Sequence, residues 1–150
     1  MDGYVSRIFT SFIDVPEEIA LAVYFSGCSI RCPGCHNKQL WNREAGIKMT
    51  DTDIIKKIHT NTLAEWVAFL GGEPTDQMEF LENICNQIKA TTNKSIALYT
   101  GREFEVLSPS LLAHLSLVVC GPYRHELHVD GWPASANQRV FRKKDTLWTL

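Results

Sequence analysis

Four apolar segments, each followed by glycine within two residues, constrain the fold of this chain more than any other feature. They cover residues 19–25, 66–70, 96–99 and 115–119. Each segment is short, contains no charged residue and is rich in strand-forming residues, as strands buried on both faces of a parallel sheet are. We therefore predict four strands of one parallel sheet.

Helical patterns alternate with these strands. Apolar residues recur at helical spacing after two candidate caps, and a third, shorter pattern begins at a Ser-Pro pair. In chain order, the candidate caps are Thr50 or Asp51, Thr75 or Asp76, and Ser108. Strands that alternate with helices through right-handed crossovers form a parallel sheet with helices outside it. We expect a single α/β domain over residues 1–150, built as a partial (open) βα barrel of mostly parallel strands, with a short irregular or β extension after Tyr123.

Composition argues against several classes of partner. The net charge is -2 and 21% of the residues are charged, without a run of five like charges, so no surface for nucleic acid is indicated. The longest apolar stretches fall short of the roughly 18 residues that a membrane span needs. The N-terminal residues lack the basic and apolar regions of a secretory signal. We expect a cytoplasmic protein that binds neither nucleic acid nor a membrane.

Three of the five cysteines lie within eight residues, which favours a metal site over a disulfide framework. Cys28, Cys32 and Cys35 form the pattern C-x-x-x-C-x-x-C on one loop. A structural zinc ion takes four protein ligands, whereas three cysteines on a 4Fe-4S cluster leave one iron open to a substrate. We predict a 4Fe-4S cluster held by these three cysteines. A zinc site completed by His36 remains the alternative.

The glycines at the strand ends indicate where a ligand would bind. Ligands of parallel α/β folds bind at the carboxyl ends of the strands, and glycine lets a ligand approach the backbone closely. The cysteine loop, Gly71-Gly72, Thr100-Gly101 and Cys120-Gly121 are all expected at that edge of the sheet. Glycine also ends strands for purely structural reasons, so the convergence of the four segments matters more than any one of them.

At these residues the sequence resembles the radical S-adenosylmethionine (SAM) enzymes, whose signature is this cysteine pattern after a strand, with a Gly-Gly-Glu-Pro motif after the next. Five motifs make the resemblance narrower: Cys32-Pro-Gly-Cys-His-Asn37 with Trp41, Gly71-Gly72-Glu73-Pro74, Tyr99-Thr-Gly101, Cys120-Gly-Pro-Tyr123 and Ser135-Ala-Asn-Gln138. In the order and spacing of these motifs, the sequence is similar to the anaerobic ribonucleoside-triphosphate reductase activating proteins, a family of glycyl-radical activating enzymes. The motifs extend over nearly the whole chain.

The resemblance implies an oxidoreductase that cleaves SAM reductively at the 4Fe-4S cluster and generates a glycyl radical on anaerobic (class III) ribonucleotide reductase. Its partners would be the large subunit of that reductase and a flavodoxin-like electron donor. The positions that match the SAM site of the family are Gly34, Cys35, His36, Gly71, Gly72, Glu73 and Thr100. Among these, the resemblance assigns the methionine amino group to Gly71, Gly72 and Glu73, and the adenosine to the others.

Two other functions remain possible from the sequence. The same radical chemistry could act on a small molecule, as in other compact enzymes with a Gly-Gly-Glu-Pro motif. A non-catalytic zinc-binding module is the more distant alternative.

Several further residues have structural interpretations. Cys85 lies in a helical pattern and is expected in the core. Cys120 is expected to pack there too, with a role at the site as the alternative. His125 and His128 near Asp130 are interpreted as a solvated loop rather than a metal cluster.

Overall fold

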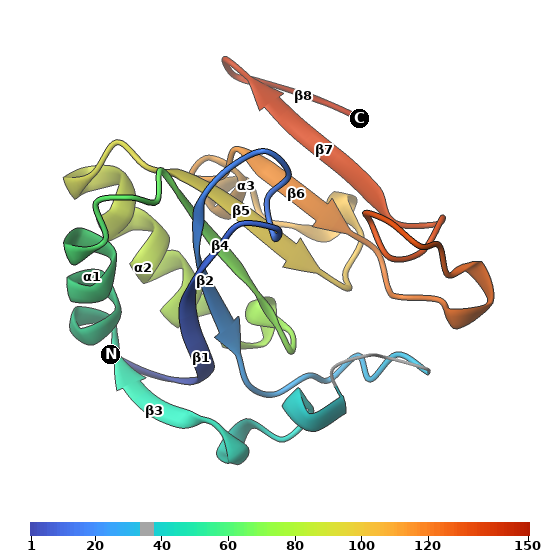
Figure 1. The fold of residues 1–150 in the computed structure, drawn as a ribbon, viewed down its shortest axis with the longest axis horizontal. Coiled ribbons are helices and arrows are strands. Elements are labelled where there is room, and N and C mark those ends of the chain that lie inside the picture. Colours follow the sequence, from blue (N-terminus) through green and yellow to red (C-terminus); the bar gives the residue numbers. More distant parts are fainter. Residues whose placement is uncertain (34–37) are drawn as a thin grey trace.

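The computed structural model describes residues 1–33 and 38–150 as an α/β fold built on one sheet (Figure 1). Within these residues the sheet has eight strands in the order β3-β1-β2-β4-β5-β6-β7-β8. The strands are β1 (Asp2–Ser11), β2 (Ala20–Phe25), β3 (Ile47–Thr50), β4 (Trp66–Gly71), β5 (Ser95–Thr100), β6 (Leu117–Cys120), β7 (Arg139–Lys144) and β8 (Leu147–Thr149). The helices are α1 (Asp51–Thr60), α2 (Met78–Thr91) and α3 (Pro109–Leu112). The prediction of an α/β fold is confirmed.

The four strands predicted from the apolar segments are β2, β4, β5 and β6, and they pair in parallel as expected. The expectation of a mostly parallel sheet is wrong, because β1 and β3 on one side and β7 and β8 on the other add antiparallel pairs. The first strand of the chain is β1, which the sequence did not reveal. Its buried positions include Gly3 and Ser11, so it lacks a regular apolar alternation. The sheet is mixed and open, with β3 and β8 at its edges.

The helices pack against one face of the sheet and close the larger of two cores (Figure 1). The predicted cap Thr50 begins α1, where its hydroxyl accepts the Asp53 N–H and the Asp53 carboxylate accepts the Thr50 N–H. Ser108 caps α3 as predicted. Cys85 on α2 is completely buried in this core, as expected. No helix of the described chain has the length and apolar character needed to cross a membrane.

The opposite face of the sheet is covered by the connection between β1 and β2, which arches over it in Figure 1. Ala22, Ala68 and Ala97 lie in register across β2, β4 and β5, and these small side chains let the covering segment approach closely. Two tyrosine hydroxyls hold that segment. Tyr24 donates to the Asp14 carboxylate at 3.1 Å, and Tyr99 donates to the Asp14 carbonyl. Burial and the neighbouring Asp14 raise the pKa of Tyr24 to about 12, so it remains a donor at neutral pH.

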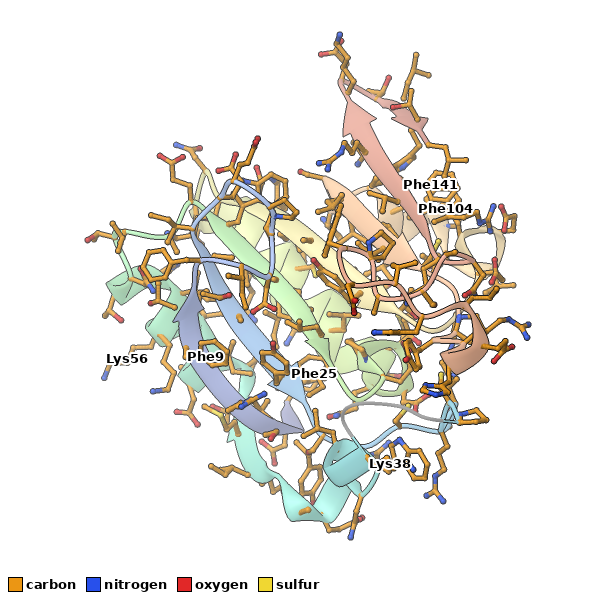
Figure 2. All side chains as sticks on the ribbon, turned by 45° about the vertical axis from the view of Figure 1, so that its right-hand side comes forward. Phe9, Phe25, Lys38, Lys56, Phe104 and Phe141 are labelled. Atoms are coloured by element: carbon orange, nitrogen blue, oxygen red, sulfur yellow. The ribbon has the colours of Figure 1, made fainter. Side chains whose placement is uncertain are left out.

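The C-terminal β extension is confirmed, although it continues the main sheet instead of forming a separate unit. β7 pairs with β6, and β8 pairs with β7. Phe141 on β7 stacks on Phe104 with ring centroids 4.0 Å apart, and Figure 2 shows the two rings together beside this hairpin. Arg139 donates to Glu103 at 2.7 Å and to Glu105 at 2.6 Å. These contacts fix the segment after β5 against β7.

Candidate functional site

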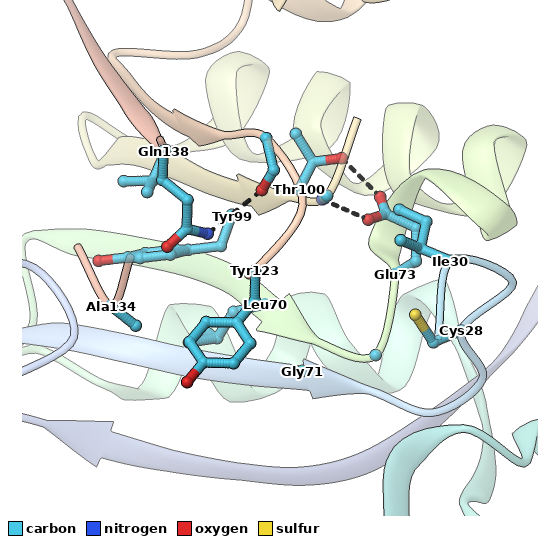
Figure 3. A pocket seen from close by; sticks show the side chains of 14 residues that line it. Cys28, Ile30, Leu70, Gly71, Glu73, Tyr99, Thr100, Tyr123, Ala134 and Gln138 are labelled. Carbon is cyan, nitrogen blue, oxygen red and sulfur yellow. Dashed lines mark hydrogen bonds between the residues drawn. The ribbon is translucent and has the colours of Figure 1, made fainter. Parts of the chain in front are cut away.

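A cavity of about 200 Å³ lies at the carboxyl ends of the parallel strands (Figure 3). Its walls come from the cysteine loop, the ends of β4, β5 and β6, and the segment between β6 and β7. The strand residues that line it include Leu70, Tyr99 and Val119. The convergence expected from the sequence is therefore present among the described residues, and it lies on the face of the sheet opposite the helices.

Glu73 is the charged group at the centre of this site. It follows β4 and is 1% exposed. One carboxylate oxygen, Oε2, accepts hydrogen bonds from the Thr75 N–H at 3.1 Å, the Thr75 hydroxyl at 2.5 Å and the Thr100 hydroxyl at 2.7 Å. The other, Oε1, accepts the Gly101 N–H at 2.7 Å. Since a carboxylate oxygen accepts about two hydrogen bonds, Oε1 retains capacity for a ligand donor.

The two glycines before Glu73 bring the cysteine loop and β4 into contact. Gly71 has a φ of +108°, which favours glycine, and a Cβ there would lie 2.6 Å from the Phe25 carbonyl oxygen. A Cβ on Gly72 would lie 2.2 Å from the Gly27 carbonyl oxygen. That same oxygen accepts the Glu73 N–H at 2.8 Å. The glycine pair therefore lets the backbone before Cys28 pack directly on the backbone before Glu73.

The structure describes two of the three predicted cluster ligands, Cys28 and Cys32. Cys28 is partly buried and lines the cavity, and burial raises the pKa of its thiol. A cation would be needed to stabilise the thiolate that metals bind. Cys32 follows on the same loop and is also partly buried. The predicted site residues Gly34, Cys35 and His36 lie outside the described residues. The described part of the donor set, two thiols on one loop, fits a thiolate-held cluster.

Of the other predicted cofactor positions, Gly71, Gly72, Glu73 and Thr100 all line the cavity together with Cys28. The opposite wall was not predicted as part of the site. It is formed by Tyr123, Ala134 and Gln138, which Figure 3 shows across the cavity from Glu73. Two of these three residues belong to the motifs that carry the family resemblance, which was the signal available for them.

Cys120 packs in the core, and the two histidines lie at the surface. The Cys120 side chain is completely buried in the core on the helix side, because alternation along β6 turns Val119 and not Cys120 toward the cavity. His125, His128 and Asp130 are exposed. Within residues 1–33 and 38–150, no group of three or more His, Cys, Asp or Glu side chains is arranged to hold a metal ion. The exposure of these histidines agrees with the interpretation as a solvated loop.

Comparisons with known proteins also indicate an iron-sulfur protein. A family model described as "4Fe-4S single cluster domain" matches residues 17–141. The anaerobic ribonucleoside-triphosphate reductase-activating protein of Enterobacteria phage T4 is 27% identical over 136 residues, which cover 85% of this chain and 86% of the phage protein. The protein of the same name from Haemophilus influenzae is 26% identical over 140 residues, covering 85% of this chain and 90% of its own length.

A second group of relatives is longer. The pyruvate formate-lyase-activating enzyme of Clostridium pasteurianum is 32% identical over 109 residues, which cover 67% of this chain but only 44% of that enzyme. The matched region thus spans less than half of the longer enzyme. The two groups together confirm the family resemblance inferred from the motifs.

Proposed function

Because the chain belongs to the 4Fe-4S single cluster domain family, we propose that it is a radical SAM activating enzyme that generates a glycyl radical on anaerobic ribonucleotide reductase. The observation that supports this most is the shared cavity of Cys28 and Glu73 at the carboxyl ends of the parallel strands. Relatives that match nearly their whole length are named as activators of the anaerobic reductase. We further propose that the four parallel strands correspond to a partial barrel of the radical SAM type.

Three thiolates, from Cys28, Cys32 and Cys35, would hold the 4Fe-4S cluster on the loop. When bound, the cluster supplies the electron that cleaves the C5'–S bond of SAM. Glu73 Oε1, which can accept a second hydrogen bond, would accept one from the methionine amino group, and the negative charge of the carboxylate would strengthen that bond. Gly34 and His36 on the loop and Thr100 at the end of β5 would border the adenosine.

The open side of the cavity is where the protein substrate would approach. Tyr123, Ala134 and Gln138 form the wall opposite Glu73. Gln138 is held in place by its amide, which donates to the Gly121 carbonyl at 3.2 Å and accepts the Ser135 N–H at 3.1 Å. A wall fixed in this way can shield a radical from water while the target glycine enters. The electron donor would be a flavodoxin-like protein.

The proposal is tested by mixing the anaerobically reconstituted, reduced protein with SAM and the large subunit of an anaerobic ribonucleotide reductase. We expect the EPR spectrum of a glycyl radical in that subunit, and no such spectrum when SAM is omitted. Formation of 5'-deoxyadenosine without the glycyl radical would contradict the protein substrate and favour a small-molecule substrate. A protein that takes up zinc and no iron would contradict the radical chemistry altogether.

A further inference from the structure

One carboxylate outside the cysteine loop holds that loop in place. Asp76 lies in the 3-10 helix Pro74–Gln77, directly after the Gly-Gly-Glu-Pro motif. One of its oxygens accepts the Ser29 N–H at 2.8 Å, and the other accepts the Ser29 hydroxyl at 2.8 Å. Ser29 is the residue next to Cys28. Two charge-assisted hydrogen bonds to a single residue fix the orientation of its backbone as well as its position.

Arg102, just after β5, connects Asp76 to the remaining strand ends. Its Nη2 donates to Asp76 at 2.8 Å and its Nε donates to the Thr75 hydroxyl at 2.9 Å. Its backbone carbonyl accepts the Gly121 N–H at 2.9 Å. The side chain of Asp76 is 16% exposed and that of Arg102 is 41% exposed, so solvent screens the pair only in part. A single residue thus links the loops that follow β4, β5 and β6.

The same network reaches the cavity through two threonines. The Thr75 hydroxyl accepts from Arg102 and donates to Glu73. The Thr100 hydroxyl accepts the Arg102 N–H at 3.1 Å and donates to Glu73. An unbroken series of hydrogen bonds therefore runs from Glu73 to Ser29. Chains of this kind reinforce one another in a partly buried environment.

We propose that Asp76 and Arg102 are positioning residues that hold the cysteine loop, and with it the cluster, at a fixed place relative to Glu73. This inference rests on the proposed function, because it requires that the loop carries a metal cluster. The arrangement has an electrostatic reason too. A carboxylate beside thiolates would repel them, and the guanidinium bound to Asp76 compensates its charge.

The test measures how fast iron leaves the reconstituted protein in the presence of a ferrous chelator under anaerobic conditions. Asp76→Asn retains the size of the side chain but removes the charge and turns a donor toward either Ser29 or Arg102. We expect it to release iron about tenfold faster than the unmodified protein, given the usual strength of charge-assisted hydrogen bonds. Arg102→Gln should also release iron faster. Arg102→Lys keeps the positive charge but cannot donate to Asp76 and Thr75 at the same time as the planar guanidinium does. Its rate of iron release should lie between those of Arg102→Gln and the unmodified protein.

Lys48→Gln is the matched control, since Lys48 lies on β3, outside the network, and its replacement removes an exposed ion pair with Asp2 on β1. Urea unfolding of the cluster-free variants separates positioning from general stability: we expect Asp76→Asn and Lys48→Gln to have similar midpoints. The inference is overturned if Asp76→Asn releases iron no faster than Lys48→Gln, or if its faster release is matched by a lowered urea midpoint. If the unmodified protein binds no iron-sulfur cluster, the proposed function itself has failed, which is a different result.

Discussion

Replacing Cys28 by alanine is expected to abolish the iron-sulfur cluster and all SAM cleavage. Cys28 is one of three expected ligands, and the structure places it on the wall of the cavity. Two cysteines cannot hold a 4Fe-4S cluster in the same way, and the chemistry depends on the cluster. We expect the yield of 5'-deoxyadenosine to fall at least ~1000-fold, to background. The measurement is iron, sulfide and 5'-deoxyadenosine after anaerobic reconstitution.

Cys85→Ala is the matched control for this variant. Cys85 is completely buried in the core on α2, away from the cavity. Its replacement should cost about 1 kcal/mol in the free energy of unfolding because it leaves a small cavity, and should leave the iron content unchanged. Cys28→Ala should instead lose its iron and keep its free energy of unfolding. Normal iron content in Cys28→Ala, or loss of iron in Cys85→Ala, would contradict the assignment of ligands.

Replacing Glu73 by glutamine is expected to have the second largest effect. The amide has one acceptor oxygen where the carboxylate has two, so its NH₂ group must face either the Gly101 N–H or the Thr75 N–H. A buried donor facing a donor costs about 1–3 kcal/mol of stability. The loss of the charged acceptor that would hold the methionine amino group should lower SAM cleavage by about 100-fold. Titration of SAM against the reduced protein, followed by product assays, measures both binding and turnover.

Glu82→Gln provides the comparison. The Glu82 carboxylate also accepts two hydroxyls, from Ser108 at 3.1 Å and Ser110 at 2.8 Å, but it lies on α2 and does not line the cavity. We expect this variant to cleave SAM at the normal rate. Should Glu73→Gln bind and cleave SAM like Glu82→Gln, the role proposed for Glu73 would be wrong.

Sequence reasoning located the parallel strands because each is a charge-free apolar segment that ends near glycine. It misplaced the beginning of α2, which starts at Met78 and not at Thr75 or Asp76. The reason is visible in the side chains. Thr75 directs its hydroxyl to Glu73, and Asp76 directs its carboxylate to Ser29, so neither caps the helix. The contact of Asp76 with Ser29 and that of Thr75 with Arg102 join residues far apart in sequence, which a local pattern does not reveal.

The candidate site was predictable where a motif marks it and unpredictable where only the fold assembles it. The cysteine pattern and the Gly-Gly-Glu-Pro motif identified Cys28 and Glu73 directly. Arg102 belongs to no motif. We infer a role for it because it forms hydrogen bonds with the loops after β4 and β6. β1 and β3, the antiparallel strands on one side of the sheet, were missed for a related reason. Their partly exposed residues alternate too weakly to stand out in the sequence.

The most direct test of the central claim is EPR of the anaerobically reconstituted, dithionite-reduced protein, recorded with and without SAM. The account predicts the signal of a reduced 4Fe-4S cluster that changes when SAM is added, because SAM binds to the open iron, together with formation of 5'-deoxyadenosine. A reduced cluster whose signal is the same with and without SAM, and no nucleoside product, would contradict it.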